Sequence, residues 1–382
     1  MFLELHILQN FAPSNLNRDD TNNPKDCGFG GVRRARISSQ CLKRAIRTAP
    51  IFKETTQAQN GIRTRWVVRL VVEDLIAAGK PAEEAALVAN EFAAAYAGKA
   101  EKPGEDGLSR TAMLVYYSPE EVHEISNALL GSWDAVLLAC KSPDDKKLQS
   151  SSPIPDLVAG LVKKSRGRTT APDIALFGRM LANDPSLNLD AAVQVAHAIS
   201  THRVDMEFDF YTAVDDLSRD EESGAGMMGV TGFNSACFYR YAHLDWDQLV
   251  RNLDGDRDLA LCTAEGFLKA AVEAVPTGKQ NTFAAHNPPS FILAVARPQG
   301  MGWSLANAFE KPIVSGREGG VVGRSVVALD AYWGRLESAY GPAGTKAYAL
   351  SLEDGVDLEH LAGAAVPSFA DLVGAVLGDL KG

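Results

Sequence analysis

The sequence predicts an α+β fold of the ferredoxin-like or RRM-like type, in which long insertions form separate lobes. Apolar stretches typical of strands alternate with stretches that have the periodicity of helices. Two insertions interrupt this alternation, one after the first helix and one after the third element. The chain has 382 residues, of which 46% are hydrophobic and 23% charged, which is typical of a globular protein.

The first part of the chain is expected to contain a strand, a polar loop and a helix. Residues 1–9 are largely apolar and predict a strand, whereas residues 10–24 are polar. Ser38 or Ser39 can cap a helix over residues 40–47. The stripe of this helix that faces the core is expected to be Leu42, Ala45 and Ile46.

The first insertion is expected to be mostly helical at its start. Residues 62–97 are rich in Ala and Val and predict helices, and residues 99–108 read as a linker. Residues 118–121, Ser-Pro-Glu-Glu, predict the capped start of another helix. Residues 141–172 are basic and are expected to be rich in loops.

The remainder is expected to return to the alternation of strands and helices. Residues 174–180 predict a buried strand, and residues 190–200 predict a helix. Further on, strands are expected at 237–241, 291–295 and 347–352, and helices at 259–275 and 324–339.

An acidic arm is expected between these parts, at residues 203–234. Its acids are followed by glycines that surround Met227 and Met228. An apolar tip of this kind, with Tyr211 ahead of it, can wedge between bases or pack on a neighbouring subunit. Ordinary packing in the core is the alternative.

Positive charge is concentrated in one short window of an acidic chain. Residues 27–72 hold ten Lys and Arg and one acid, Glu54, although the formal net charge of the chain is −10. The window therefore carries +9 and the remainder −19. Clustered cations such as Arg33, Arg34 and Arg36, behind a glycine loop and ahead of a helix start, predict a site for a polyanion. A solvated basic helix face is the alternative.

The sequence contains no pattern that favours a metal site or a catalytic nucleophile. On the helix expected there, His197 and His202 would not share a face, which disfavours a metal site with Asp205 and Asp209. No Ser or Cys lies in the context of a nucleophile elbow, and the adjacent acids at 19–20 and 215–216 diverge. The pattern favours binding over catalysis.

Cysteine spacing and hydropathy favour the reducing cytoplasm. The five cysteines, at 27, 41, 140, 237 and 262, form no Cys-x-x-Cys pair. No apolar run approaches the roughly 20 residues of a membrane-spanning helix, and the N-terminus lacks the features of a signal peptide.

Several blocks of sequence together carry a family resemblance. They are Leu16–Asp20, Phe29–Gly31, Arg33–Arg34, Arg36–Gln40, Leu42–Arg44, Gly178–Met180, Ala196–Ile199, Phe210–Leu217, Phe238–Ala242 and Ala306–Lys311. With these blocks in one order, the chain resembles, nearly from end to end, the CasC backbone subunits of type I-E CRISPR Cascade. The resemblance implies a hand-like protein that has an RRM-like palm, a helical finger insertion and a thumb loop.

The resemblance also implies boundaries and residue roles. The palm would comprise residues 1–58, 173–202 and 237–382, the fingers 59–172 and the thumb 203–236. The residues implied to hold RNA are Arg18, Lys25, Ser38, Gln40, Lys43, Arg44, Arg47, Lys146, Lys147 and Lys311, with Arg317 nearby in sequence. Those implied to kink the guide and displace a nucleotide are Met180, Tyr211, Thr212, Met227 and Met228.

The partners implied are a CRISPR RNA, the target DNA strand and further copies of the chain in a helical filament. They also include the large, small, 5′-handle cap and 3′-hairpin endoribonuclease subunits of Cascade and, indirectly, a helicase-nuclease. The resemblance implies a cytoplasmic, non-catalytic protein that needs neither cofactor nor metal and contacts no membrane.

Two other functions are compatible with parts of the sequence. An endoribonuclease of the same fold would need an acid or a histidine at each displaced nucleotide, for which Asp19, Asp20 and Asp215 are the available candidates. A general single-strand RNA-binding RRM protein would show stacking aromatics in a Gly-Phe-Gly-Phe-Val-like motif, and the sequence has none.

Overall fold

The computed structural model divides the chain into two compact units. The first comprises residues 1–55, 193–246 and 264–382, and the second comprises residues 56–192 and 247–263. The structure describes residues 1–96, 100–142, 144–145, 148, 150–181, 185–213, 227–316, 320–341 and 344–381. The α+β class expected from the sequence is confirmed, because a large antiparallel sheet lies in the first unit and helices make up most of the second.

The first unit is organised by a nine-stranded sheet in which all pairs are antiparallel. Its main path runs β11–β10–β1–β9–β7–β3–β2, while β6 and β8 also pair with β9. The strands are β1 Phe2–Ser14, β2 Asp26–Phe29, β3 Val32–Ile37, β6 Val193–Val195, β7 Ala198–Ser200, β8 Glu207–Ala213, β9 Met227–Asp245, β10 Phe291–Arg297 and β11 Lys346–Ser351.

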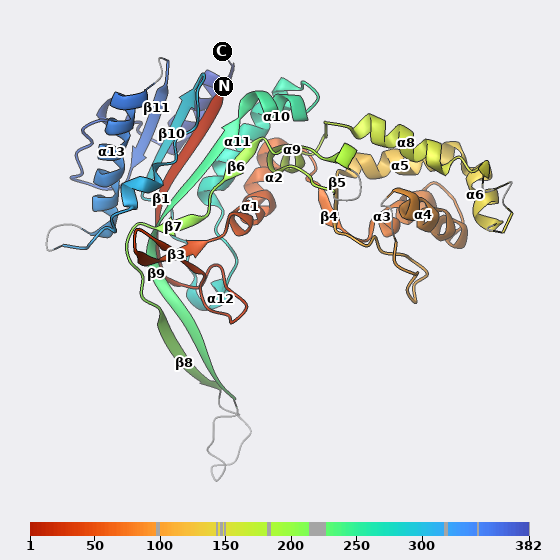
Figure 1. The fold of residues 1–382 in the computed structure, drawn as a ribbon, viewed down its shortest axis with the longest axis horizontal. Coiled ribbons are helices and arrows are strands. Elements are labelled where there is room, and N and C mark those ends of the chain that lie inside the picture. Colours follow the sequence, from red (N-terminus) through yellow and green to blue (C-terminus); the bar gives the residue numbers. More distant parts are fainter. Residues whose placement is uncertain are drawn as a thin grey trace, which may run out of the picture. The chain divides into compact units, whose positions relative to one another are not determined.

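Strand β1 forms the centre of this sheet and is buried on both faces from residue 3 to residue 9. On one face, Leu5 and Ile7 lie beside Leu42 and Ile46 of helix α1, Ser39–Thr48. On the other face, Leu8 packs in a cluster with residues of helix α13, Val321–Tyr340. Figure 1 shows helices on both sides of the sheet, so neither face of β1 is open to solvent.

The helices of the first unit flank these strands. They are α1 Ser39–Thr48, α12 Gln280–Phe283, α13 Val321–Tyr340 and α14 Phe369–Lys381, with 3-10 turns η3 Leu305–Phe309 and η4 Ala362–Ala364. Helices α2 Pro50–Thr56, α10 Trp246–Asn252 and α11 Arg257–Glu273 each contain residues of both units.

One strand belongs both to the sheet and to a projecting hairpin. The first part of β9 pairs with β8, from Met227 opposite Ala213 to Phe233 opposite Glu207. The rest of β9 pairs with β1, ending at Asp245 opposite Phe2. Figure 1 shows the resulting β8–β9 hairpin extending away from the sheet. The arm expected from the sequence is therefore present, as two paired strands.

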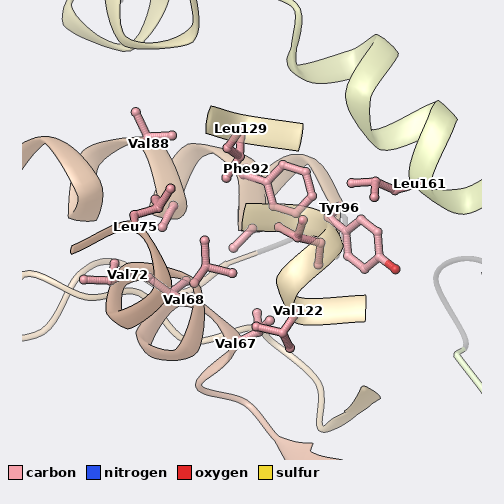
Figure 2. Packing of buried hydrophobic residues seen from close by; sticks show 14 of the residues in the cluster. Val67, Val68, Val72, Leu75, Val88, Phe92, Tyr96, Val122, Leu129 and Leu161 are labelled. Carbon is pink, nitrogen blue, oxygen red and sulfur yellow. The ribbon is translucent and has the colours of Figure 1, made fainter. Parts of the chain in front are cut away.

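The second unit is a helical layer with a small two-stranded sheet. Its elements are β4 Ile62–Thr64, α3 Val67–Ala77, α4 Ala82–Tyr96, β5 Val115–Tyr117, α5 Pro119–Gly131, α6 Trp133–Lys141, α8 Ile154–Ser165, α9 Pro172–Phe177 and the 3-10 turn η1 Pro185–Leu187. Figure 2 shows its core, where Val68 and Leu75 of α3 lie with Val88 and Phe92 of α4 and Leu129 of α5. The capping box predicted at Ser118 and Glu121 is confirmed.

Three secondary-structure predictions are wrong. The strand expected at residues 174–180 is replaced by α9 at Pro172–Phe177, and residues 190–200 form β6 and β7 in place of a helix. The run in α9 is buried from Pro172 to Leu176 and so carries neither period, while β6 and β7 are three residues each and are fixed by their pairing with β9. The basic stretch 141–172 contains helix α8, whose residues Ile154 and Leu161 enter the helical core.

The units also differ from the boundaries that the resemblance implies. Residues 173–192 and 247–263, which the resemblance assigns to the palm, pack within the second unit. Hydrogen bonds of Asn252 hold these two stretches together. Its side-chain amide donates to the carbonyls of Ala175 and Asp190, each at 2.8 Å. Its own carbonyl accepts from the amide of Thr169 at 2.8 Å.

None of the helices in the described part of the chain combines the length and the apolar character that crossing a membrane requires. The same residues bring no three His, Cys, Asp or Glu side chains together as a metal site.

A buried ionic cluster lies on one face of β1. Glu4, His6 and Arg297 are fully buried, and Arg297 Nε donates to Glu4 Oε1 at 2.8 Å. His6 Nδ1 lies 2.9 Å from the hydroxyl of Tyr239, and its Nε2 lies 3.6 Å from Glu4 Oε2. Burial lowers the pKa of His6, although Glu4 works in the opposite direction. The neutral imidazole is therefore the form that the fold accommodates.

We expect the stability of the protein to fall as the pH drops below about 6.5, the ordinary pKa of an unfolded His. Because the pKa of His6 is lowered by folding, the unfolded state binds more protons there, and acid favours unfolding. His6→Gln should make the melting temperature less dependent on pH between about pH 7 and pH 5. His286→Gln removes an exposed histidine and is the control. The same pH dependence in wild type and His6→Gln would contradict this expectation.

Candidate nucleic-acid interface

Helix α1 presents a basic stripe. Gln40, Lys43, Arg44 and Arg47 follow the spacing i, i+3, i+4 and i+7, which places them on one face. Leu42 and Ile46 are buried, whereas Gln40 and Arg44 are exposed and Lys43 and Arg47 are half-buried. Burial lowers the pKa of Lys43. The helix thus anchors its apolar side in the sheet and turns a cationic side outward.

Side chains of the protein already occupy the amides at the start of α1. Ser38 caps the helix by accepting from the amide of Cys41 at 3.3 Å. Asn17 Oδ1 accepts from the amide of Ser38 at 2.8 Å, and His197 Nδ1 accepts from the amide of Ser39 at 3.1 Å. A phosphate at these amides, as the sequence suggested, would have to displace Asn17 and His197. The cationic side chains are therefore the better anion ligands.

His197 is a support for α1 and not half of a metal pair with His202. Its Nδ1 accepts from Ser39 and also lies 3.3 Å from Arg36 Nη1, so the ring carries its proton on Nε2. The pKa of His197 is lowered by desolvation and by the cations Arg36 and Lys25. The contact of Arg36 with His197, and the 2.9 Å hydrogen bond from the amide of Arg36 to the carbonyl of Lys25, place both residues beside the start of the helix.

The loop between β1 and β2 is held together by Asp19. Its Oδ1 accepts from the amide of Thr21 at 2.9 Å, from the hydroxyl of Thr21 at 2.7 Å and from the amide of Asn23 at 3.0 Å. The hydrogen bond from Thr21 is the main reason that the pKa of Asp19 is lowered. Arg18 is exposed in this loop and donates to Asn22 at 3.2 Å.

Arg33 and Arg34 are neighbours with opposite environments. Arg33 is exposed and pairs with Asp26 on the facing strand. Arg34 is fully buried, and its guanidinium donates to the carbonyls of Phe29, Ser200 and Phe309 at 3.1, 3.1 and 2.7 Å. The prediction that Arg34 contacts RNA is wrong, because no phosphate can reach a guanidinium buried among carbonyls.

The glycine turn after β2 permits a close approach of two chain segments. Gly30 has φ +60, and a side chain there would collide with the main-chain oxygen of Glu310. Arg34 also donates to that oxygen at 3.3 Å. The exposed Lys311 follows directly in the chain. Long-range packing thus brings Lys311, distant in sequence, next to the turn that carries Arg33.

The two faces of the β8–β9 hairpin differ. Tyr211 lies opposite Gly229, and its ring covers that glycine. Thr212, which is exposed, lies opposite Met228, so Met228 is on the other face from Tyr211. Tyr211 therefore does not lie beneath Met228. The main chain of Met227 pairs with Ala213.

The face that carries Met228 is apolar and exposed. Phe208, Phe210, Met228 and Val230 are 63%, 61%, 67% and 62% exposed. The sequence reasoning missed Phe208, Phe210 and Val230. The signal that could have found them is the alternation of Phe208 and Phe210 with acids at 207 and 209, which predicts a two-sided strand.

The remaining expected residues lie elsewhere. Met180 is 83% exposed and belongs to the second unit, whereas Tyr211 belongs to the first. Lys146, Lys147, Arg317, Asp215 and Asp216 lie outside the described residues. The structure thus assembles Lys25, Arg36 and the α1 stripe into one basic surface of the first unit.

Comparisons with known proteins show which proteins the whole chain is similar to. The family model described as "CT1975-like protein", a Cas family, matches residues 3–375. The chain is similar to a chain of a solved "CRISPR RNA-guided surveillance complex, pre-nicking", with 30% identity, a TM-score of 0.87 and 100% coverage of both chains. It is also similar to a chain of a "CRISPR RNA-guided surveillance complex", with 26% identity, a TM-score of 0.77 and 99% coverage of both. The curated proteins gave no match.

We expect Arg34→Lys to lower the free energy of unfolding by about 2–4 kcal/mol, because a lysine cannot span the buried carbonyls that Arg34 joins. Arg33→Lys is the matched control and should cost less than about 0.5 kcal/mol, since it alters an exposed ion pair. Urea denaturation of both variants gives the comparison. Equal destabilisation of the two variants would show that Arg34 is not a structural residue.

Proposed function

The chain belongs to the CT1975-like family of Cas proteins, and from this membership we propose that it is the non-catalytic, CRISPR RNA-binding backbone subunit, CasC, of a type I-E surveillance complex. The observation that carries the proposal is the full-length likeness to a chain of a CRISPR RNA-guided surveillance complex, at 30% identity and a TM-score of 0.87. Copies of the chain would polymerise along one guide RNA and present it to target DNA in antiviral defence.

The basic surface of the first unit would hold the backbone of the guide. Lys43, Arg44 and Arg47 would neutralise phosphates, with Lys25 and Arg18 extending the path along the loop before β2. Arg33 and Lys311 would extend it toward the glycine turn. Contacts to phosphates alone accept any guide sequence, which suits a system in which base pairing reads the sequence.

The strand order supports an RRM-like palm. β1, β7, β9 and β10 lie in the order β10–β1–β9–β7, as in a β-α-β-β-α-β fold whose first and third strands are central. A general RRM protein stacks bases on the open face of such a sheet. Here both faces of β1 are covered over residues 3–9, which disfavours that alternative. The second unit, chiefly residues 59–172, would be the fingers, and Lys146 and Lys147 would face nucleic acid there.

The β8–β9 hairpin would be the thumb. Tyr211 offers an exposed aromatic surface, and Thr212, Met228 and Met227 lie on the paired strands beside it. The hairpin would kink the guide and displace one nucleotide at regular intervals. The partners would be the other Cascade subunits, the target strand and, indirectly, a helicase-nuclease, in a cytoplasmic ribonucleoprotein.

The hydrogen bonding of Asp19 disfavours the endoribonuclease alternative. A catalytic carboxylate needs its oxygens for a metal or a proton in transfer, whereas Asp19 Oδ1 is committed to the amides of Thr21 and Asn23 and the Thr21 hydroxyl. We therefore propose that the chain binds its guide and target without cleaving either.

Replacing Lys43, Arg44 and Arg47 together with Ala should abolish guide retention. A plot of the logarithm of RNA affinity against the logarithm of salt concentration has a slope that reports the number of neutralised phosphates. The magnitude of this slope should fall by about 0.7 for every phosphate that is no longer neutralised. The measurement is the ratio of nucleic-acid to protein absorbance after purification from cells that carry a CRISPR array. Thermal denaturation verifies that the variant is folded.

The matched control for this triple variant replaces Arg335, Lys346 and Lys381, which removes equal charge elsewhere in the first unit. It should keep the guide. Guide retention and an unchanged salt slope in the α1 variant would refute the assignment. As a companion test, the wild-type assembly with Mg²⁺ should leave complementary DNA and RNA strands intact.

Tyr211→Ala should weaken target-strand binding by about 1–3 kcal/mol, the value of stacking one base on an aromatic ring. Met228→Asp should leave the monomer folded but impair assembly or pairing, because a carboxylate would replace an exposed apolar side chain. The measurement is target affinity for guides with one mismatch at each successive position. Tolerated mismatches should recur at a regular interval, and a uniform penalty along the guide would remove the role of the thumb.

A further inference from the structure

A second cationic site lies in the second unit, around Trp66. The indole of Trp66 is flanked by two guanidinium groups, with Arg110 Cζ 4.0 Å and Arg69 Cζ 4.8 Å from the ring centroid. Arg63 lies over Tyr116, with its Cζ 5.9 Å from that centroid. The side chains of Arg63, Arg69 and Arg110 are exposed.

These residues are held by β4, the start of α3 and the segment 100–111. Trp66 and Arg69 are three residues apart at the start of α3, so they share a face. The amide of Thr111 donates to the carbonyl of Arg65 at 2.9 Å, and Arg65 Nε donates to the carbonyl of Thr111 at 2.8 Å. This exchange fixes Arg110 over Trp66, although 44 positions of sequence separate them.

Nearby carboxylates neutralise only part of the charge. Glu101 pairs with Arg65, and Asp106 lies 3.3 Å from Arg69. The segment 100–111 also contains Glu105 and Lys102. Arg63 and Arg110 form no ion pair with a carboxylate in the part of the chain that the structure describes. The site therefore keeps a positive balance in a chain of net charge −10.

The buried arginines of this protein show what a purely structural guanidinium looks like. Arg34 is fully buried, and carbonyl groups accept from its guanidinium; Arg179 is 5% exposed and is bound by Glu121 and by carbonyls. Arg63 and Arg110 differ, since their side chains are exposed and their guanidinium groups lie over aromatic rings, contacts that restrict their movement. A guanidinium that is oriented in advance loses less entropy when it binds a planar pair of oxygens.

We propose that Arg63, Arg69 and Arg110, arranged around Trp66 and Tyr116, form a binding site for the phosphodiester backbone of nucleic acid, separate from the α1 stripe. Stacked guanidinium groups offer paired N–H donors that match two phosphate oxygens. The site goes beyond the proposed function, because it requires neither a guide nor the thumb. Guide RNA and target DNA share this chemistry, and the experiment distinguishes them.

The test variant is Arg63→Gln with Arg69→Gln and Arg110→Gln, which substitutes a long polar side chain at each position and removes three charges. Fluorescence anisotropy measures binding of a labelled polythymidylate strand, a labelled DNA duplex and a labelled polyuridylate strand across a salt series. The full chain is purified from cells without a CRISPR array. We expect at least about tenfold weaker binding at low salt and a salt slope lower by about 2 for a single strand.

Two further variants make the result specific. Arg335→Gln removes an arginine that also stacks on an aromatic ring, 5.1 Å from the centroid of Tyr332 in the first unit, and should bind as wild type. Arg63→Gln alone disturbs the fold least, and should lower the slope by about 0.7 for a single strand even if the triple variant unfolds. Equal binding by Arg63→Gln and wild type would overturn the site, as would an equal reduction in Arg335→Gln.

The different probes and the purification with a CRISPR array also distinguish a failure of this site from a failure of the proposed function. A reduction confined to the DNA probes assigns the site to target DNA, and one confined to polyuridylate assigns it to the guide. In cells with a CRISPR array, the triple variant should still retain its guide, since the α1 stripe is intact. If wild type retains no guide but the oligonucleotide results stand, the proposed function fails and the site remains.

Discussion

The antiparallel pairing of β1 with β9 is the interaction on which the rest of the first unit depends. Strand β1 is buried on both faces, so its amides and carbonyls must all be bonded within the sheet. The register with β9 runs from Phe2 opposite Asp245 to Ser14 opposite Asn234. Because β9 continues past this point, the same strand supplies one half of the hairpin with β8. The proposed thumb is therefore an extension of the most buried part of the fold.

Arginines in this chain divide into those that hold the fold and those that face solvent. Arg34 and Arg297 are fully buried and Arg179 nearly so, and each donates hydrogen bonds to carbonyls or to a carboxylate inside the protein. A buried, paired cation contributes little to the electrostatic potential outside the protein, and it is this potential that attracts nucleic acid. The positive window of the sequence thus overstates the proposed binding surface, which would comprise the α1 stripe, Lys25, Arg36 and the exposed cations of nearby loops.

Hydrogen bonds at the start of α1 fix the orientation of the proposed binding helix as the protein folds. Asn17 and His197 hold the amides of Ser38 and Ser39, which fixes the direction of the helix without a ligand. The stripe that follows is consequently oriented before nucleic acid arrives, and binding costs mainly the ordering of side chains. Recognition through phosphates on a fixed helix is independent of base identity, which is what a backbone subunit of an RNA-guided complex requires.

The sequence by itself determined those features that depend on local periodicity and capping. It determined the strand at the N-terminus, the helix over residues 40–47 that Ser38 or Ser39 could cap, the capping box at Ser118, the acidic arm and the position of the positive window. Tertiary structure alone decided that residues 172–177 are helical, because a run buried on all sides carries no period, and that β6 and β7 are strands, because pairing with β9 fixes such short segments. It also decided that Arg34 is buried beside the exposed Arg33, that Lys311 lies at the glycine turn, and that Arg110 stacks on Trp66. These outcomes rest on hydrogen bonds and contacts between segments far apart in the chain, which no local pattern contains.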